Sequence, residues 1–236
     1  MDSILNIGIN DKNVDALASN FNDERFALDS YRRLIQMYGN VVLEIEMDRF
    51  EAIIDNKKRI DGVENDNDFD SEQLSWIIDA FKTTVERFGG NPFPQDPIIQ
   101  LKLSIEAVFK SWLNKRAVTY RKINNIPNNL GTATTVQSMV FGNLNESSGT
   151  GVAFTRFPST GKNKLYGEYL MNAQGEDVVA GIRTPYPIGK HEKNTQPSLE
   201  EENPALFNDI KFIGDKLETH YKDCLLYTSD AADDEE

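Results

Sequence analysis

The sequence predicts an α+β protein, because its first half has the apolar spacing of helices and its second half shows strand-like alternation before a final helix. In residues 22–90, apolar side chains recur at steps of three and four, which is the period of helices with one buried face. From residue 136, apolar and polar residues alternate with a period of two, as in a strand. Helices first and mixed elements later favour an α+β arrangement.

Three amphipathic helices are expected within residues 22–90. Asp48 is the expected N-cap of the second helix, and Ser71 is that of the third, which follows an acidic loop at residues 62–70. The expected buried positions are Tyr31, Leu34, Ile35, Tyr38, Val42, Phe50, Ile53, Ile54, Leu74, Ile77, Ile78, Phe81 and Val85.

A run of Gly and Pro at residues 89–94 interrupts this helical pattern and marks an expected boundary. We therefore expect a mainly helical subdomain at residues 1–95 and a mixed part at residues 96–223. Asp96 and Pro97 are the expected start of a further helix, because Pro is tolerated in a first helical turn. The expected buried face of this helix consists of Ile98, Leu101, Ile105, Val108, Phe109 and Trp112.

Strands are expected at residues 136–141, 152–157 and 164–169, the last two joined as a hairpin by a turn at residues 158–161. Val178 and Val179 are expected to begin another strand. Asn203 and Pro204 are expected to start a last helix. Its expected apolar face consists of Leu206, Phe207, Ile210, Ile213 and Leu217.

Charge and composition exclude several classes of protein. The 236 residues carry a formal net charge of −13, which argues against general nucleic-acid binding because phosphate backbones attract basic surfaces. No apolar run has the roughly 18 residues of a membrane span, so no membrane association is expected. A single cysteine, Cys224, excludes an internal disulfide and fits a reducing compartment, either the cytoplasm or an organelle stroma.

Two short segments carry candidate binding chemistry. In Asn145–Gly151, two glycines let the backbone approach a ligand, and successive N–H groups with the Thr150 hydroxyl can hold phosphate oxygens; the alternative is an ordinary Gly-rich turn. In Gln174–Asp177, two carboxylates can accept hydrogen bonds from ribose hydroxyls; the alternative is a solvated acidic turn. The residues alone do not decide between these alternatives.

The basic side chains Arg116, Arg121 and Lys122 can bind phosphate, but pairing with carboxylates of the same chain is the favoured interpretation. His191 and His220 are not clustered with other metal ligands, so no metal site is expected in this chain. His220 falls near the end of the last helix, where a cation complements the helix dipole.

Several blocks of the sequence, by their order and spacing, resemble the pyruvate, phosphate dikinase family. They are DSYRRLIQMYGNVV (29–42), FPQDP (93–97), RAVTYRKINNIPNNLGTA (116–133), VQSMVFGN (136–143), SSGTGVAFTRFPSTG (147–161) and YGEYLMNAQGEDVVAGIRTPYPI (166–188). The resemblance is nearly continuous from Met1 to Asp223 and implies a fragment of an ATP-grasp-like nucleotide-binding domain with an inserted helical subdomain.

The resemblance also implies the chemistry of the parent enzyme. That family transfers the β,γ-phosphates of ATP to a histidine on a separate swivelling domain. Inorganic phosphate takes the outer phosphoryl group, and pyruvate takes the other, giving phosphoenolpyruvate, AMP and pyrophosphate. ATP and Mg²⁺ are the implied cofactors, the full-length enzyme is expected to be a homodimer, and this fragment alone is expected to be inactive.

By the same resemblance, seven positions match the nucleotide-binding segments of the family: Met1, Gln137, Thr150, Gly151, Glu176, Asp177 and Val178. The phosphohistidine and the metal-coordinating carboxylates have no counterpart here. Residues 224–236 are foreign to the family and resemble a translated adapter sequence, so we interpret them as an artefact and expect no element of the family fold there.

Two alternative functions stay open. The first is a fragment of a water dikinase, which makes phosphoenolpyruvate without inorganic phosphate, although residues 174–188 fit the phosphate-using family better. The second is a non-catalytic adenine-nucleotide-binding module, which the weak or absent ATP binding expected of residues 1–223 would oppose.

Overall fold

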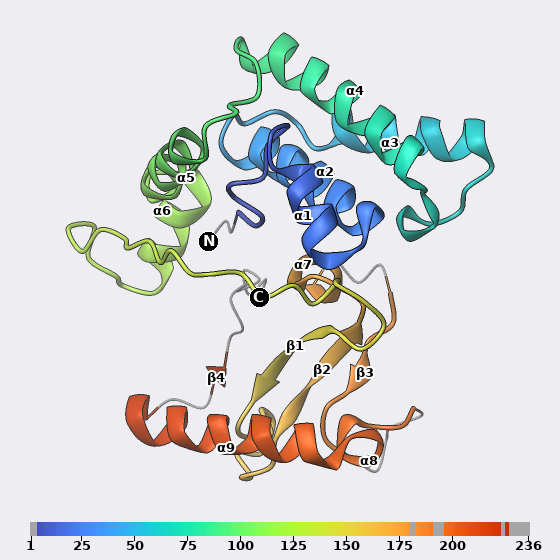
Figure 1. Cartoon of the computed structure of the whole chain (residues 1–236). Helices are drawn as coiled ribbons and strands as arrows, with labels where there is room; N and C mark the ends of the chain where they lie inside the picture. The colour runs from blue at the N-terminus through green and yellow to red at the C-terminus, as the bar shows by residue number, and fades with distance from the viewer. Residues whose placement is uncertain (1–3, 180–182, 191–195, 223–224, 227–236) are drawn as a thin grey trace. The chain divides into compact units, whose positions relative to one another are not determined.

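The computed structural model describes residues 4–179, 183–190, 196–222 and 225–226 (Figure 1). Contacts between residues divide the chain into two compact units, residues 1–139 and residues 140–236. Helices make up the first unit, and a small antiparallel sheet with helices makes up the second. The α+β class expected from the sequence is therefore confirmed, while residues 96–139, expected in the mixed part, lie in the helical unit.

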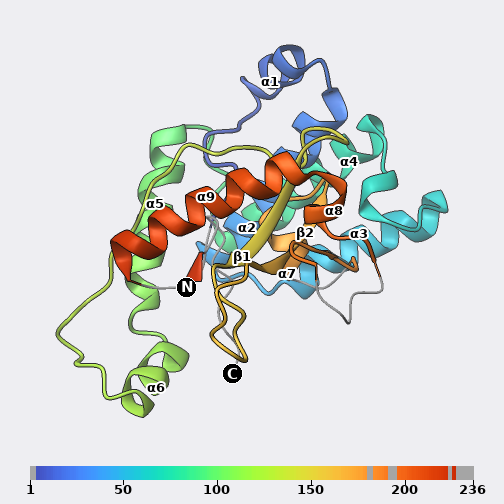
Figure 2. The same cartoon turned by 90° about the horizontal axis from the view of Figure 1, so that it is seen from below.

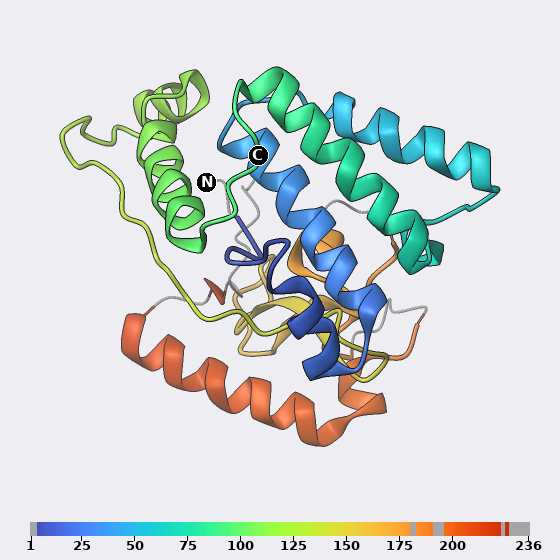
Figure 3. The same ribbon diagram turned by 45° about the horizontal axis from the view of Figure 1, so that its top comes forward.

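The first unit is built on long helices that pack side by side, α2 against α1 and α4, and α4 against α3 (Figure 3). Its elements are α1 (Val14–Phe21), α2 (Glu24–Val41), α3 (Asp48–Asp61), the 3₁₀ turn η1 (Asp66–Asp68), α4 (Ser71–Gly89), α5 (Pro97–Ser111) and α6 (Lys115–Ile123).

Side-chain caps fix several of these helix starts. The carboxylate of Asp23 accepts a hydrogen bond from the Phe26 N–H at 2.8 Å, and Asp96 accepts one from the Ile98 N–H at 2.8 Å. Asp70 caps α4 and exchanges hydrogen bonds with Gln73, which is a capping box. The expected caps Asp48 and Ser71 are wrong by one position, because each is the first residue of its helix.

The core of the first unit is where the helical periodicity placed it. Every expected apolar position of α4 is buried, and so are most of those of α2 and α3. The Phe50 and Phe81 rings meet edge to face with centroids 5.0 Å apart, which joins α3 to α4. The main core residues are Phe26, Tyr31, Leu34, Ile35, Tyr38, Phe50, Leu74, Ile77, Phe81, Val85 and Phe93.

The fully buried residues of helix α5 differ from those expected, although Leu101, Ile105, Val108 and Trp112 are half-buried. Gln100 and Ser104 are its buried residues, whereas Ile98 is 70% exposed. The Gln100 side chain accepts a hydrogen bond from the Gly8 N–H at 2.8 Å and donates to the carbonyls of Ile9 at 3.0 Å and Pro94 at 2.8 Å. Hydrogen bonds to three backbone groups thus stabilise the Gln100 amide in the interior. Apolar spacing in the sequence does not predict such a position.

The second unit contains a four-stranded antiparallel sheet in the order β3-β2-β1-β4. Its strands are β1 (Gly149–Phe154), β2 (Tyr166–Met171), β3 (Tyr186–Pro187) and β4 (Leu225–Leu226), and its helices are α7 (Gly175–Val179), α8 (Leu199–Glu202) and α9 (Pro204–Tyr221). β1 and β2 pair from Gly149 with Met171 to Phe154 with Tyr166, which confirms the expected hairpin. Helices α8 and α9 lie across the sheet (Figure 2).

Two of the expected strands are wrong. Residues 131–141 form neither helix nor strand, and Val136 and Val140 are 62% and 91% exposed, because no neighbouring strand among the described residues pairs with them. Val178 and Val179 belong to α7 rather than to a strand. The Asp177 side chain accepts a hydrogen bond from the Gln174 N–H at 2.8 Å, and this local bond favours a helical turn over the strand preference of two valines.

Helix α9 starts at Pro204 as expected, with Asn203 as its cap. Of the five apolar positions expected on its buried face, Phe207 and Ile210 pack against the core of the second unit, but Leu206, Ile213 and Leu217 are exposed. That core is small and consists of Ala153, Leu165, Tyr169, Ile188 and Leu199. Among the described ranges, no helix has the length and apolarity that crossing a membrane requires.

Candidate functional site

Three segments of the second unit meet at the beginning of the β1–β2 hairpin. They are residues 142–143, the start of β1 at Gly149, and residues 172–174 after β2. The Ala173 N–H donates to the Gly142 carbonyl at 3.0 Å, and the Asn172 N–H donates to the Ser148 carbonyl at 2.7 Å. We call this arrangement the three-segment junction. It links both candidate binding segments of the sequence, because Thr150 follows one arm and Glu176 follows another.

Gly142 is at the point of closest approach in the three-segment junction. A Cβ atom at this position would lie 2.4 Å from the Ala173 carbonyl oxygen and 2.8 Å from the Gly149 carbonyl oxygen. Real Cβ atoms do not approach backbone oxygens so closely, and neither oxygen belongs to a side chain that can turn away. Gly142 is therefore required for packing at this point.

Gln174 connects two arms of the junction from inside the unit. Its side chain is only 2% exposed, and its Nε2 donates to Asn143 Oδ1 at 3.0 Å. Its backbone exchanges two hydrogen bonds with Asp177, one to the Asp177 carboxylate at 2.8 Å and one from the Asp177 N–H at 3.0 Å. Gln174 thus ties the first turn of α7 to the segment that precedes β1.

Thr150 and Gly151 lie in β1 rather than in a loop, opposite Leu170 and Tyr169 of β2. A Cβ atom on Gly151 would lie 2.7 Å from the Glu168 carbonyl oxygen, so the missing side chain permits close contact between the strands. The Thr150 side chain is half-buried. The part of the expected loop that does turn is Asn145–Ser148, where Asn145 Oδ1 accepts hydrogen bonds from the Ser147 N–H and hydroxyl at 2.9 and 2.7 Å.

Glu176, Asp177 and Val178 all lie on α7, half-buried, and α7 packs against β1 and β2. The two candidate segments are therefore neighbours in one unit. The Asp177 carboxylate already caps its own helical turn, which supports the structural alternative for that residue. Gln137 is exposed in the unpaired stretch of the first unit, and Met1 lies outside the described residues.

Sequence patterns did not single out Arg183. Its Nη1 donates to the Asn172 carbonyl and its Nη2 to the Met171 carbonyl, both at 3.0 Å. Asn172 has a left-handed backbone with φ of 48°, and the guanidinium holds the carbonyl groups at that bend. A fork of donors aimed at two backbone oxygens has no periodic signature, and only the resemblance block 166–188 contained it.

Arg121 of the basic set after α5 has a structural role, as favoured, but among the described residues its partners are a carbonyl, an amide and an aromatic ring rather than the expected carboxylates. Arg121 is 4% exposed, its Nη1 donates to the Trp112 carbonyl at 2.7 Å, and its guanidinium lies 3.9 Å from the centroid of the Trp112 ring. Arg116 and Lys122 are exposed. His220 lies in the last turn of α9, as expected, and its ring meets that of Tyr221 at 4.7 Å; His191 lies outside the described residues.

A buried ion cluster in α2 was also missed. Asp29 accepts hydrogen bonds from Arg32 Nε at 2.9 Å and Arg33 Nε at 3.0 Å, and all three side chains are buried. Burial alone would raise the pKa of Asp29, but the charges of Arg32 and Arg33 outweigh burial and hold the pKa well below its ordinary value. The spacing of these residues at three and four positions is a helical signal that apolar patterning ignores.

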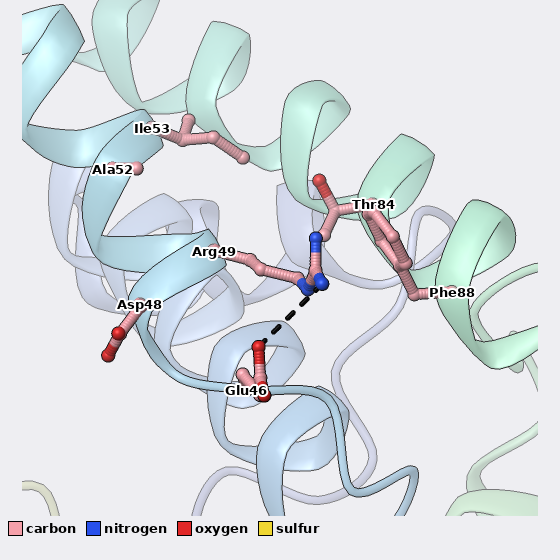
Figure 4. A pocket seen from close by; sticks show the side chains of 7 residues that line it. All are labelled: Glu46, Asp48, Arg49, Ala52, Ile53, Thr84 and Phe88. Carbon is pink, nitrogen blue, oxygen red and sulfur yellow. Dashed lines mark ion pairs between the residues drawn. The ribbon is translucent and has the colours of Figure 1, made fainter.

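A shallow pocket of about 460 Å³ lies in the first unit on α3 and α4. Its lining residues are Glu46, Asp48, Arg49, Ala52, Ile53, Thr84 and Phe88 (Figure 4). Arg49 spans it, with its guanidinium 3.9 Å from the Phe88 ring centroid and Nη2 3.6 Å from Glu46 Oε2. None of the sequence-predicted binding residues lines it. Within the part of the chain that the structure describes, no three His, Cys, Asp or Glu side chains gather as a metal cluster.

Comparison with known proteins gives a consistent result. A family model described as "Pyruvate phosphate dikinase, AMP/ATP-binding domain" matches residues 1–224. The chain is 50% identical over 227 residues to a pyruvate, phosphate dikinase of Rhizobium meliloti (strain 1021), covering 94% of this chain and 25% of the relative.

Two further relatives are equally similar in extent. One is a pyruvate, phosphate dikinase of Clostridium symbiosum, 50% identical over 224 residues, with 94% of this chain and 25% of the relative covered. The other is the rice protein "Pyruvate, phosphate dikinase 1, chloroplastic", 47% identical over 225 residues, with 95% of this chain and 23% of the relative covered. The chain thus spans about a quarter of the length of these relatives.

Proposed function

The chain belongs to the pyruvate phosphate dikinase AMP/ATP-binding domain family, and from this premise we propose that it forms part of the ATP site of a pyruvate, phosphate dikinase. In the parent enzyme, ATP gives its β,γ-phosphates to a histidine on a swivelling domain and leaves as AMP. Inorganic phosphate then removes the outer phosphoryl group as pyrophosphate, and pyruvate takes the remaining one to become phosphoenolpyruvate. The chain supplies nucleotide-binding residues and no phosphohistidine.

The observation that carries this proposal is the neighbourhood of two segments. The family resemblance assigns Thr150 and Gly151 to the phosphates of ATP, and Glu176, Asp177 and Val178 to its adenosine end. In the second unit α7 packs directly against β1, so one nucleotide can touch both segments. The sheet of the second unit and the helices of the first unit are compatible with an ATP-grasp-like domain that carries an inserted helical subdomain.

The chemistry of Thr150, Glu176 and Val178 suits their proposed roles, whereas the Asp177 carboxylate caps the first turn of α7. The Thr150 hydroxyl and backbone N–H groups near Gly151 donate hydrogen bonds to phosphate oxygens. Glu176 accepts hydrogen bonds from ribose hydroxyls, and Val178 contacts the apolar base. For Gln137 and Met1, the family resemblance alone supports a nucleotide-facing role. Catalysis of this type consists mainly of positioning and charge neutralisation, because phosphoryl transfer requires little covalent work from the protein.

Mg²⁺ is the proposed metal that would neutralise the phosphates of ATP in this chemistry. By the family resemblance, the metal-coordinating carboxylates have no counterpart in this chain, so we propose that they lie in another part of the parent enzyme. Pyruvate, phosphate and the swivelling phosphohistidine domain are the other proposed partners. We also propose that the parent enzyme is a homodimer in the cytoplasm or an organelle stroma.

The proposal is tested in the full-length enzyme by AMP formation from ATP, pyruvate and phosphate. Thr150→Val removes one donor to the phosphates and should lower kcat/KM for ATP about tenfold or more. Glu176→Ala should raise KM for ATP by about tenfold. Matched controls are Thr219→Val on α9 and Glu72→Ala on α4, which make the same chemical changes at exposed positions. Parental kinetics in both site variants would refute the assignment.

A further inference from the structure

We propose that Gln174 is a positioning residue that sets the distance between the phosphate-binding and adenosine-binding segments of the nucleotide site. The inference rests on the proposed function and extends it to a side chain that contacts neither the phosphates nor the adenosine of the ligand. Gln174 is buried, precedes Glu176 by two residues, and bonds to Asn143 on the arm that leads to β1.

The Gln174 side chain is buried, and a buried amide without hydrogen-bond partners costs free energy. Its Nε2 donates to Asn143 Oδ1, while the backbone N–H of Gln174 donates to the Asp177 carboxylate in the first turn of α7. Its Nε2–Oδ1 bond to Asn143 joins residues that are 31 positions apart in the chain. The bond therefore fixes tertiary geometry rather than local conformation.

The backbone around Gln174 is closely packed. The backbone of Gly142 is packed against the carbonyls of Ala173 and Gly149, so close that no Cβ fits between them. Hydrogen bonds from Ala173 to Gly142 and from Asn172 to Ser148 hold the same arms. In this closely packed three-segment junction, the Gln174–Asn143 bond is a side-chain link between the start of α7 and the segment before β1.

A molecule that binds through two linked parts gains affinity only when the two protein subsites are held at the matching separation. ATP is such a ligand if its phosphates meet β1 and its adenosine meets α7. Removing the Gln174–Asn143 hydrogen bond should therefore lower the affinity for ATP. The affinities for adenosine alone and for tripolyphosphate alone should stay almost unchanged.

The experiment uses the full-length enzyme and measures dissociation constants for three probes: Mg-ATP, adenosine and Mg-tripolyphosphate. In Gln174→Met, which keeps the side-chain size but removes the amide, the dissociation constant of ATP should rise about tenfold or more, while those of adenosine and tripolyphosphate rise less than about threefold. Asn143→Leu should change the three dissociation constants in the same way. Asn143→Asp keeps an acceptor for Gln174 Nε2 and should restore ATP affinity to within about threefold of the parent.

Gln100→Met is the matched control. It removes an equally buried amide from α5 in the first unit, so it should lower the melting temperature without changing the ratio of ATP to tripolyphosphate affinity. Equal weakening of all three probes in Gln174→Met and Asn143→Leu, or no weakening in either, overturns the positioning role alone. A parental enzyme that binds none of the probes overturns the proposed function and, with it, this inference.

Discussion

Arg156 of the β1–β2 connection and Glu218 of α9 are joined by two short contacts, Nε to Oε1 at 2.7 Å and Nη2 to Oε1 at 2.6 Å. They link the hairpin to the helix that lies across it. The carboxylate of Glu218 is mostly buried, whereas the Arg156 side chain is partly exposed. The pair therefore ties two elements of the second unit at their solvent edge.

This pair predicts a pH dependence. Hydrogen bonding by Thr155 and by Arg156 lowers the pKa of Glu218 from its ordinary 4.5. A lowered folded-state pKa means that the stabilisation is complete above about pH 4.5 and is lost as the pH falls through the folded-state value. Glu218→Gln should therefore cost about 0.5–1 kcal/mol near neutral pH and progressively less in acid.

The measurement is urea unfolding followed by amide NMR signals of β1 and β2. Asp209→Asn, an exposed carboxylate on the same helix, is the control and should change little at any pH. A destabilisation by Glu218→Gln that stays constant across the acid range would contradict the linkage.

The buried cluster in α2 gives a second prediction. Asp29→Asn removes the buried carboxylate that accepts hydrogen bonds from both Arg32 and Arg33, and should destabilise the first unit by about 3–5 kcal/mol. Both tryptophans of the chain, Trp76 and Trp112, lie in this unit, so their fluorescence reports its unfolding. Asp55→Asn on the exposed side of α3 is the matched control, and a cost equal to that control would disprove the role of the cluster.

The close approach at Gly142 gives a third prediction. Gly142→Ala forces two backbone carbonyls apart and should destabilise the second unit by about 2 kcal/mol or more. Gly161→Ala is the comparison, because its φ of +67° makes it strained while the space around it is open. Its cost should stay near 1–2 kcal/mol, the penalty of the left-handed conformation alone. Hydrogen exchange of the β1 amides measures both, and a Gly142→Ala variant at or below Gly161→Ala would refute the packing argument.

Strand β4 gives a fourth prediction. Leu225 and Leu226 pair with Phe154 and Ala153 at the edge of β1, just beyond the family match at residue 224. A chain ending at residue 222 should expose this edge and self-associate, because unpaired strand edges recruit other strands. A chain ending at residue 226 keeps the pairing and removes most of the acidic tail. Sedimentation velocity measures the self-association of both shortened chains. Stronger association of the chain that ends at residue 222 is the expected result, whereas equal association of both would attribute the effect to the loss of charge.

The sequence predicted elements well where local pattern and burial agree. The core faces of α2, α3 and α4, the hairpin and the start of α9 all follow from apolar spacing, caps and turn residues. Predictions failed where a polar contact decided the outcome, as at Gln100 in α5 and Asp177 in α7. The strand expected at residues 136–141 failed for another reason, since alternation is not enough without a partner strand.

In the candidate site too, local patterns predicted some residues, and contacts between distant residues determined the others. Residue patterns proposed the segments around Thr150 and Glu176, and their packing against one another follows from the sheet register. Patterns could not find Gly142, Gln174 or Arg183, because their roles depend on close approach and on hydrogen bonds between distant parts of the chain.

The inward turn of the Gln100 amide has a consequence for mutational tolerance. On most amphipathic helices, a scan of all substitutions finds the apolar positions intolerant and the polar ones permissive. On α5 of this chain the ranking should be reversed: Gln100 and Ser104 should reject replacement, while Ile98, Phe109 and their exposed neighbours accept polar residues with the fold intact. A hydropathy scale used to choose solubilising substitutions here would rank the positions in the wrong order.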